Sequence, residues 1–231
     1  MGLPMEELIP ANEAQRLEAL RRFDVLDTPR DGAFDRITRL ASEILEMPIS
    51  IVSLVDHDRI WFKSTHGLEG VDEIDRVPGL CASAILGEEI WEIKDAKVDP
   101  RALANPLVAG EFGLRFYAGS PLRTGDGYNL GTLCVIDKRP RALTEKQARV
   151  LHDLAALVVD ELELRLAARR QARRATELND DVVQALVVAK MHLQLDERDR
   201  AASSLDQALD SAKRILAELV EDAPNLRRGE G

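Results

Sequence analysis

The stretch between Thr144 and Leu195 constrains the fold of this chain most, because it contains neither proline nor glycine. Thr144 is followed three residues later by Gln147, which is the spacing of a capping box at the start of a helix. We therefore predict one helix of about 50 residues, about 75 Å long at about 1.5 Å per residue. A helix of this length is stable only when another surface covers its apolar side chains.

A second helix is expected over residues 201–221, after a short polar break at residues 196–199. Its apolar residues follow the heptad pattern of packed helices, at Leu205, Leu209, Ala212, Leu216 and Leu219. The facing stripe on the first helix consists of Leu178, Val182, Leu186, Ala189 and Leu193. We predict that the two helices form a hairpin, and that two hairpins form a four-helix bundle in a homodimer.

The chain changes character near residue 141. Before that point, short apolar runs typical of strands alternate with helical runs and turn signals. The expected elements are helices at 11–24, 34–45 and 80–86 and strands at 49–55, 60–64, 90–93, 115–122 and 130–136. This order predicts an α+β domain at residues 12–165, with antiparallel strands flanked by helices. The hairpin follows at residues 166–222, its first helix continuous with the last helix of the domain, and we expect a disordered tail at 223–231.

Composition narrows the classes of function. The formal charge of −10 argues against a nucleic-acid-binding protein, because the phosphate backbone would be repelled. No apolar run approaches the roughly 20 residues that span a bilayer, and no signal peptide opens the chain, so we expect no membrane partner. The two cysteines, Cys81 and Cys134, are far apart in the sequence and suggest no disulfide framework, so we expect a reducing, cytoplasmic setting. His57, His66, Cys81 and Cys134 lack the short paired spacing of structural zinc sites, so no bound metal is expected.

Several blocks of the first half occur together and in order. They read LDTPRDGAFDRITRLA at 26–41, ISIVSLVDHDRIWFKSTHGL at 49–68, DPRALANPLV at 99–108, RFYAGSPL at 115–122 and LGTLCVIDKRPRALTEKQ at 130–147. Together they resemble a GAF domain of the bacterial kind found beside histidine kinases and diguanylate cyclases. The resemblance implies a six-stranded antiparallel sheet with helices on one face and a small-molecule pocket on the other. It names neither the ligand nor a cofactor.

Known GAF chemistries help to test what such a pocket could hold. The signature of the cyclic-nucleotide-binding members is missing, and Cys81 is followed by Ala82 rather than by the histidine common at bilin attachment sites. The cysteines are best explained as buried apolar side chains, with a redox-sensing thiol as the open alternative. Candidate ligand contacts in the pocket are Trp61, Cys81, Arg101, Arg115 and Tyr117. Strand alternation places Trp61 and Phe62 on opposite faces of the sheet, and an anion could meet Arg101 or Arg115.

The second half carries a different signal. ELNDDVVQ at residues 177–184 resembles the phosphoacceptor box of a histidine kinase in which Asn179 stands where the histidine would be. An amide nitrogen is not nucleophilic at neutral pH, so Asn179 cannot accept a phosphoryl group. The glycine-rich nucleotide boxes of such kinases are also missing. We therefore expect no autokinase activity from this degenerate dimerisation element.

Two classes of function follow. In the first, a GAF domain senses a small ligand or partner, and the helical bundle docks a response regulator or a histidine kinase without catalysis. In the second, Asp180 and Gln184, four residues apart on one helix face, assist hydrolysis of a response regulator's aspartyl phosphate. The competing interpretation is that Asp180 and Gln184 are solvated helix positions without a catalytic role.

Overall fold

The computed structural model describes residues 9–103 and 105–221, apart from the side chains of residues 175, 177–179, 181 and 215–221. The expected tail at 223–231 lies outside the described residues. The chain divides into two compact units, Met1–Leu166 and Ala167–Gly231, and one helix contributes to both. Each unit is described by itself below.

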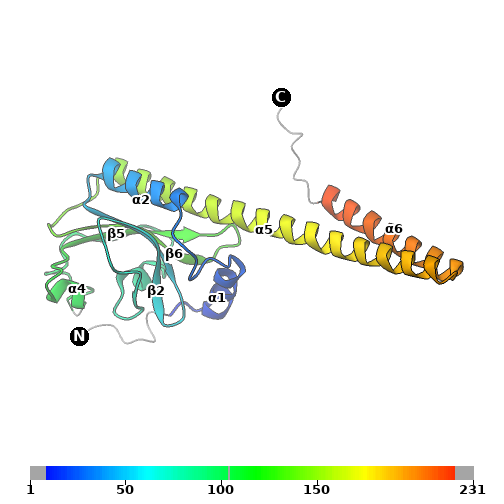
Figure 1. Ribbon diagram of the computed structural model, residues 1–231. Helices are drawn as coiled ribbons and strands as arrows, with labels where there is room; N and C mark the ends of the chain where they lie inside the picture. Colours follow the sequence, from blue (N-terminus) through cyan, green and yellow to red (C-terminus); the bar gives the residue numbers. More distant parts are fainter. Residues whose placement is uncertain (1–8, 104, 222–231) are drawn as a thin grey trace, which may run out of the picture. The chain divides into compact units, whose positions relative to one another are not determined.

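The first unit is built on one sheet of six antiparallel strands (Figure 1), in the order β3-β2-β1-β6-β5-β4. The strands are β1 (Ile49–Val55), β2 (Arg59–His66), β3 (Glu73–Asp75), β4 (Trp91–Ile93), β5 (Phe116–Arg123) and β6 (Asn129–Asp137). The GAF resemblance implied a six-stranded antiparallel sheet with flanking helices, and this fold is confirmed. The short strand β3 was not predicted.

The two central strands approach each other unusually closely at Gly131. Gly131 pairs with Leu54, and a Cβ atom at Gly131 would lie 1.9 Å from the carbonyl oxygen of Ser53. Any larger residue would therefore force β1 and β6 apart. Every residue of β1 is buried, which requires cover on both faces of the sheet.

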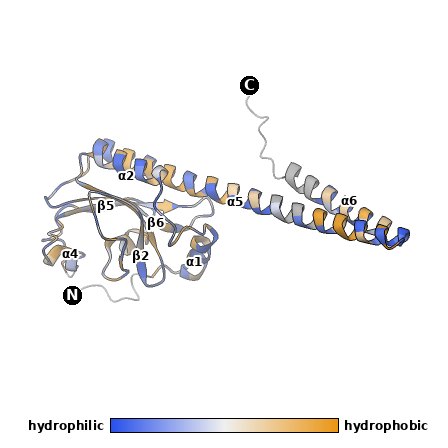
Figure 2. Cartoon of the chain, in the orientation of Figure 1, coloured by the Kyte–Doolittle hydropathy of each residue, from blue (hydrophilic) through white to orange (hydrophobic). Residues whose placement is uncertain are grey.

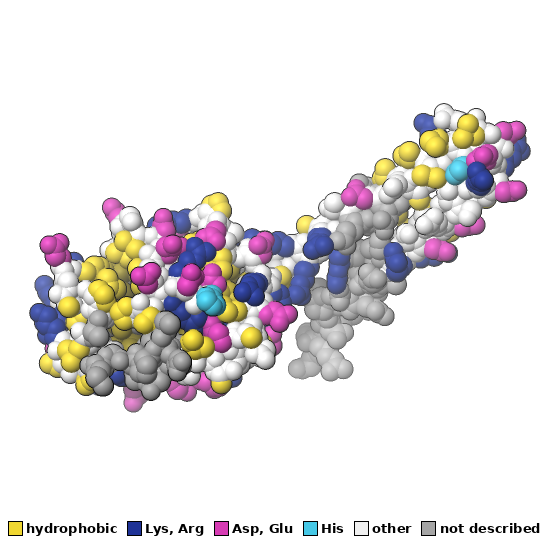
Figure 3. All heavy atoms as spheres, turned by 90° about the horizontal axis from the view of Figure 1, so that it is seen from below, with side chains coloured by type: hydrophobic (Ala, Val, Ile, Leu, Met, Phe, Trp, Pro, Cys, Tyr) yellow, Lys and Arg dark blue, Asp and Glu magenta, His cyan; other side chains and the backbone are white. Residues whose placement is uncertain are grey.

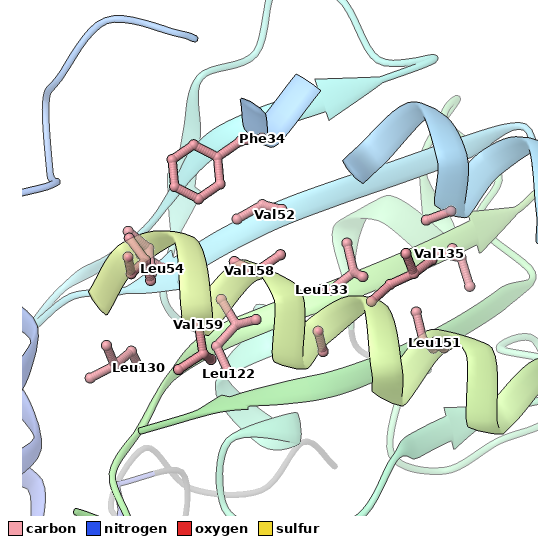
Figure 4. Packing of buried hydrophobic residues seen from close by; sticks show 14 of the residues in the cluster. Phe34, Val52, Leu54, Leu122, Leu130, Leu133, Val135, Leu151, Val158 and Val159 are labelled. Carbon is pink, nitrogen blue, oxygen red and sulfur yellow. The ribbon is translucent and has the colours of Figure 1, made fainter. Parts of the chain in front are cut away.

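Helices cover one face. They are α1 (Glu13–Arg22), α2 (Gly32–Leu45) and the first part of α5 (Glu145–Gln194). Asp31 caps α2 by accepting a hydrogen bond from the Ala33 amide at 3.1 Å. Figure 4 shows side chains of α5, such as Leu151 and Val158, packed on side chains of β6, such as Leu133 and Val135. All four residues are fully buried.

The opposite face is covered by shorter elements and loops. These elements are α3 (Leu80–Ala84) and α4 (Pro106–Ala109). Their apolar side chains join a second core with alternate residues of the strands, such as Ile51, Phe62 and Cys134. The sheet therefore separates two cores, and the second of these cores contains the cavity described below.

The second unit is a helical hairpin formed by the second part of α5 and by α6 (Arg198–Glu221). The α5 helix is 50 residues long, and its expected capping box is present because Thr144 and Gln147 exchange hydrogen bonds. The turn places Asp196 at a φ of 60°, and the Glu197 amide donates to the His192 carbonyl at 2.9 Å. The long helix and the hairpin are confirmed. The four-helix bundle stays a prediction.

The packing inside the hairpin differs from the expected facing stripes. Small residues are buried between α5 and α6, namely Ala189, Ala201 and Ala208. Four large members of the stripes are instead exposed, with exposed fractions of 47% at Leu186, 56% at Leu193, 44% at Leu205 and 54% at Leu209. The side chains of the predicted members Leu178, Leu216 and Leu219 lie outside the described residues. Figures 2 and 3 show apolar residues over the hairpin and on its surface. Among the described helices, none combines the length and apolar character needed to cross a membrane.

Candidate functional site: an apolar cavity and a polar groove

An apolar cavity lies in the second core, on the sheet face opposite α2 and α5. Its volume is about 90 Å³, which corresponds to about three water molecules of liquid volume. Strand residues Ile51, Phe62, Tyr117, Cys134 and Ile136 form its floor, and the rest of its wall is Leu68, Val71, Ile74, Leu80, Cys81, Leu107, Phe112 and Leu114. Several of the wall residues are only half-buried, so the cavity reaches towards solvent on that side.

Strand alternation decides which aromatic side chains face the cavity. Phe62 lines the cavity, whereas its neighbour Trp61 packs in the core between the sheet and the helices. The expected separation of these two residues is confirmed, but Trp61 is not among the residues that line the cavity. Trp61 instead borders a separate surface hollow beside residues 27–30.

The strand register brings the two cysteines to the same cavity. Cys134 on β6 lies opposite Ile51 on β1 and Gly119 on β5, and Cys81 comes from α3. Both thiols are buried. Their distance in the sequence gave no sign of this, because only the pairing of β1, β5 and β6 places Cys134 beneath α3.

A row of hydroxyl groups accompanies the thiols. The Tyr117 hydroxyl donates to the Cys81 sulfur at 3.4 Å and lies 3.5 Å from the Thr132 hydroxyl. Thr132 in turn lies 2.9 Å from the Ser53 hydroxyl. The polar atoms at the cavity floor are therefore linked to one another within an apolar enclosure.

These neighbours shift the pKa values in opposite directions. The neighbouring Cys134 thiol lowers the pKa of Cys81 to about 6, against burial, which raises it, and the hydroxyls of Ser53 and Tyr117 help to lower it. Interaction with Cys81 and burial together raise the pKa of Cys134. Burial and the proximity of both thiols raise the pKa of Tyr117, so its hydroxyl stays protonated.

The character of the lining limits what can bind. None of the described residues that line the cavity carries a basic side chain, so the phosphates of a nucleotide would be buried without a counter-charge. A small uncharged molecule fits this lining, since apolar cavities bind small apolar ligands, and the volume of about 90 Å³ limits such a ligand to a few non-hydrogen atoms. Across the described residues, no three His, Cys, Asp or Glu side chains gather around a possible metal ion.

The two arginines proposed as anion contacts lie outside the cavity lining. Arg101 pairs with Asp99 at 2.6 Å and stacks over the Trp91 ring at 5.0 Å. Arg115 makes two hydrogen bonds to Asp95, at 2.7 and 2.6 Å. Of the five predicted ligand contacts, the structure therefore brings only Cys81 and Tyr117 together at the cavity.

A charged cluster lies on the face of β2 that points away from the cavity. Lys63, which is 2% exposed, donates to the Thr28 hydroxyl and to the Pro29 carbonyl at 2.7 Å each. Its ammonium lies 3.3 Å from Asp31, which accepts two hydrogen bonds from Arg165 of α5 at 2.5 and 2.7 Å. Sequence reasoning missed this cluster, because its members come from three distant segments.

The second unit carries a polar groove between α5 and α6, with a volume of about 940 Å³. Gln184 lines it together with Ala185, Val188, Ser203, Ser204, Asp206, Gln207, Asp210, Ser211 and Arg214. Asp180 is exposed and is not among the lining residues. Asn179 belongs to α5, but its side chain lies outside the described set. Sequence reasoning missed the contribution of α6 to this groove.

Known proteins resemble the first unit. A family model described as GAF domain matches residues 29–162. The cyclic di-GMP phosphodiesterase PA2567 of Pseudomonas aeruginosa is 40% identical over 151 residues, which are 65% of this chain and 26% of that protein. This chain therefore spans about a quarter of the length of that relative.

Solved structures also resemble the first unit. The GAF domain of an Acinetobacter phosphoenolpyruvate-protein phosphotransferase matches with a TM-score of 0.51 and 21% identity, over 66% of this chain and 95% of that chain. A free methionine-R-sulfoxide reductase from Neisseria meningitidis matches with a TM-score of 0.48 and 20% identity, over 74% of this chain and 97% of that chain.

Proposed function

The chain belongs to the GAF domain family, and from that premise we propose that it is a cytoplasmic signal-transduction sensor. In this proposal the GAF domain binds a small uncharged ligand in its apolar cavity. The helical hairpin, a degenerate relative of a histidine-kinase dimerisation element, then docks a response regulator or a histidine kinase. The similarity to a cyclic di-GMP phosphodiesterase over 151 residues is compatible with a signalling role.

One observation carries the proposal. Phe62 and Lys63 are neighbours on β2, and their side chains lie on opposite faces of the sheet. Phe62 lines the cavity, while Lys63 is tied to Asp31, which in turn holds Arg165 of α5. A ligand that displaces Phe62 therefore acts on a strand that is joined to α5 by two ion pairs, Lys63–Asp31 and Asp31–Arg165. This gives the cavity a physical connection to the helix that continues into the hairpin.

Native mass spectrometry of the freshly purified full chain tests the ligand. We expect a retained small molecule in the wild type and its loss in Val71→Phe, which adds bulk at the half-buried side of the cavity. Val98→Phe is the matched control, because Val98 is 73% exposed and does not line the cavity. Equal retention in both variants would place the ligand elsewhere and contradict the proposal.

We also propose that the hairpin forms a homodimer through a four-helix bundle. Among its described side chains, the hairpin buries only the small residues Ala189, Ala201 and Ala208 and leaves large apolar side chains exposed, among them Leu186, Met191, Leu193, Leu205 and Leu209. A second hairpin would cover these side chains and remove them from water. Light scattering should give a dimer for the full chain and a weaker dimer or a monomer for a chain that ends near Arg165. A monomeric full-length protein would overturn this part of the proposal.

A second candidate function is hydrolysis of a regulator's aspartyl phosphate. The position of Gln184 at a polar groove favours it, because an amide there could orient a water molecule towards a docked phosphoryl group. Such positioning would accelerate hydrolysis on the order of tenfold to a hundredfold. Gln184→Ala should abolish most of this stimulation, and Gln194→Ala, which changes an exposed glutamine of the same helix, should not. If a bound regulator loses its phosphate no faster than a free one, the hairpin only docks.

A further inference from the structure

The two cysteines of the chain both line the apolar cavity, and they come from elements that are far apart in the sequence. Cys81 belongs to α3 and Cys134 to β6, and α3 packs directly on β6. They are the only thiol groups of the chain. We propose that Cys81 and Cys134 are a reversible thiol–disulfide pair that small hydroperoxides oxidise inside the cavity. This inference deepens the proposed sensor function by naming a chemical class of signal.

The surroundings of Cys81 differ from those of a cysteine that only fills space. The Tyr117 hydroxyl points at the Cys81 sulfur at 3.4 Å and lies next to Thr132, which Ser53 contacts in turn. A buried apolar filler needs no hydroxyl donor, whereas a thiolate does. The chain places this donor within a lining that is otherwise apolar.

The position of Tyr117 depends on the absence of a side chain at Gly119. Gly119 is the strand partner of Cys134, and a Cβ atom at Gly119 would lie 2.4 Å from the Tyr117 hydroxyl oxygen. The Tyr117 ring can therefore lie across Gly119 only because that residue has no side chain. The Tyr117 ring therefore lies over Gly119 of the same strand, β5, and its hydroxyl reaches the Cys81 sulfur.

The oxidation proceeds in two balanced steps. The Cys81 thiolate attacks the outer oxygen of a hydroperoxide, and the O–O bond breaks to give Cys81 sulfenic acid and, after uptake of one proton, an alcohol or water. The Cys134 thiol then attacks the sulfenic sulfur, and the hydroxyl leaves with the thiol proton as water. The sum is two thiols and one hydroperoxide giving one disulfide, one alcohol or water, and one further water.

The order of the two steps follows from the surroundings of the thiols. Cys81 has the lowered pKa and the hydroxyl contact, so it supplies the attacking thiolate, and Cys134 resolves the sulfenic acid. Tyr117 remains protonated and can donate to the departing oxygen. Each of the three side chains therefore has a separate role.

The cavity also selects the oxidant by size. A volume of about 90 Å³ accommodates hydrogen peroxide or a short alkyl hydroperoxide. A disulfide as large as oxidised glutathione, a dimer of a tripeptide, exceeds that volume many times over. The thiol pair should therefore respond to small hydroperoxides and resist oxidised glutathione under conditions in which the chain stays folded.

The test treats the reduced full chain with hydrogen peroxide and follows intact mass and non-reducing peptide maps. We expect the loss of two hydrogens and a linked pair of peptides containing Cys81 and Cys134, both reversed by dithiothreitol. Cys134→Ser should stop at the sulfenic acid, trapped on Cys81 by a cyclic 1,3-diketone. Cys81→Ser should leave Cys134 unreacted over the same time.

A third variant separates the proposed chemistry from a merely structural effect. Tyr117→Phe keeps the ring and removes the hydroxyl, so it should slow sulfenic acid formation on the order of tenfold while the chain keeps its unfolding midpoint within a few degrees. In urea, where the cavity is lost, the two thiols should react at similar rates.

Two free thiols after excess hydrogen peroxide, or oxidation that starts at Cys134, would overturn the inference. Either result would leave untouched the ligand retention and dimer measurements that test the proposed function. The two failures are therefore distinguishable.

Discussion

At the scale of single residues, Gly119 controls the geometry of the cavity floor. Replacing Gly119 with alanine should push the Tyr117 hydroxyl away, because the new Cβ would lie 2.4 Å from it. We expect a loss of about 1–3 kcal/mol in the free energy of unfolding, as for other overpacked core positions. Urea unfolding measures this change. Gly87→Ala is the control, since nothing lies within 4 Å of a Cβ atom there, and it should be close to neutral.

Asp31 provides a second prediction at this scale. Burial raises its pKa, but the hydrogen bonds from Arg165 and from the Ala33 amide outweigh burial, so the pKa is lowered from the usual 3.8. The stabilisation by Asp31 is therefore complete above the unfolded pKa and disappears as the pH falls through the lower folded value. Asp31→Asn should lower the free energy of unfolding at pH 7 by about 1–2 kcal/mol, a charged hydrogen bond discounted for partial exposure.

The pH dependence of this difference is the decisive measurement. Denaturant unfolding of the wild type and Asp31→Asn should show a constant difference above about pH 5, which shrinks below about pH 4. A difference that grows with acid would mean that the Asp31 carboxylate does not stabilise the fold. Asp72→Asn is a suitable control, because its pair with Arg30 is largely exposed.

At the scale of elements, the exposed stripe of the hairpin predicts how dimerisation responds to charge. Leu209→Lys places an ammonium on a side chain that is 54% exposed in the single chain and would be covered in the bundle. We expect the dissociation constant to rise about tenfold or more, since burying an unpaired charge is costly. Analytical ultracentrifugation gives the constant. Ala202→Lys makes the same change of charge at another exposed position of α6 and should have little effect.

The elements themselves show what sequence patterns can and cannot reveal. The capping box at Thr144 and the absence of glycine and proline predicted α5, because these signals are local. Alternation placed Trp61 and Phe62 on opposite faces for the same reason. The three-residue strand β3 and the meeting of Cys81 with Cys134 depend on strand pairing between distant segments. The cluster of Asp31, Lys63 and Arg165 was missed for the same physical reason.

At the scale of the whole molecule, α5 passes from a covered environment to an exposed one. In the first unit its side chains Leu151 and Val158 are fully buried, whereas in the second unit Val187 and Met191 are more than half exposed. Hydrogen exchange should therefore be slowest for the amides of α5 around residues 151–162 and faster around residues 183–191. Mass spectrometry of exchanged peptides measures this gradient.

Protein concentration adds a control to that experiment. If a second hairpin covers the exposed stripe, protection around residues 183–191 should rise with concentration, while protection around residues 151–162 should stay constant. Protection in the hairpin that is independent of concentration over the range in which the dimer forms would contradict the bundle.

The placement of the two tryptophans has a practical consequence. Trp61 packs among the helices on one face of the sheet, and Trp91 lies against the core on the other face, with its ring at 5.6 Å from the Tyr117 ring. The protein therefore carries one intrinsic fluorophore for each layer. In Trp61→Phe, emission from the remaining Trp91 would report on the cavity side of the sheet. In Trp91→Phe, emission from the remaining Trp61 would report on the helix side, in both cases without an attached dye.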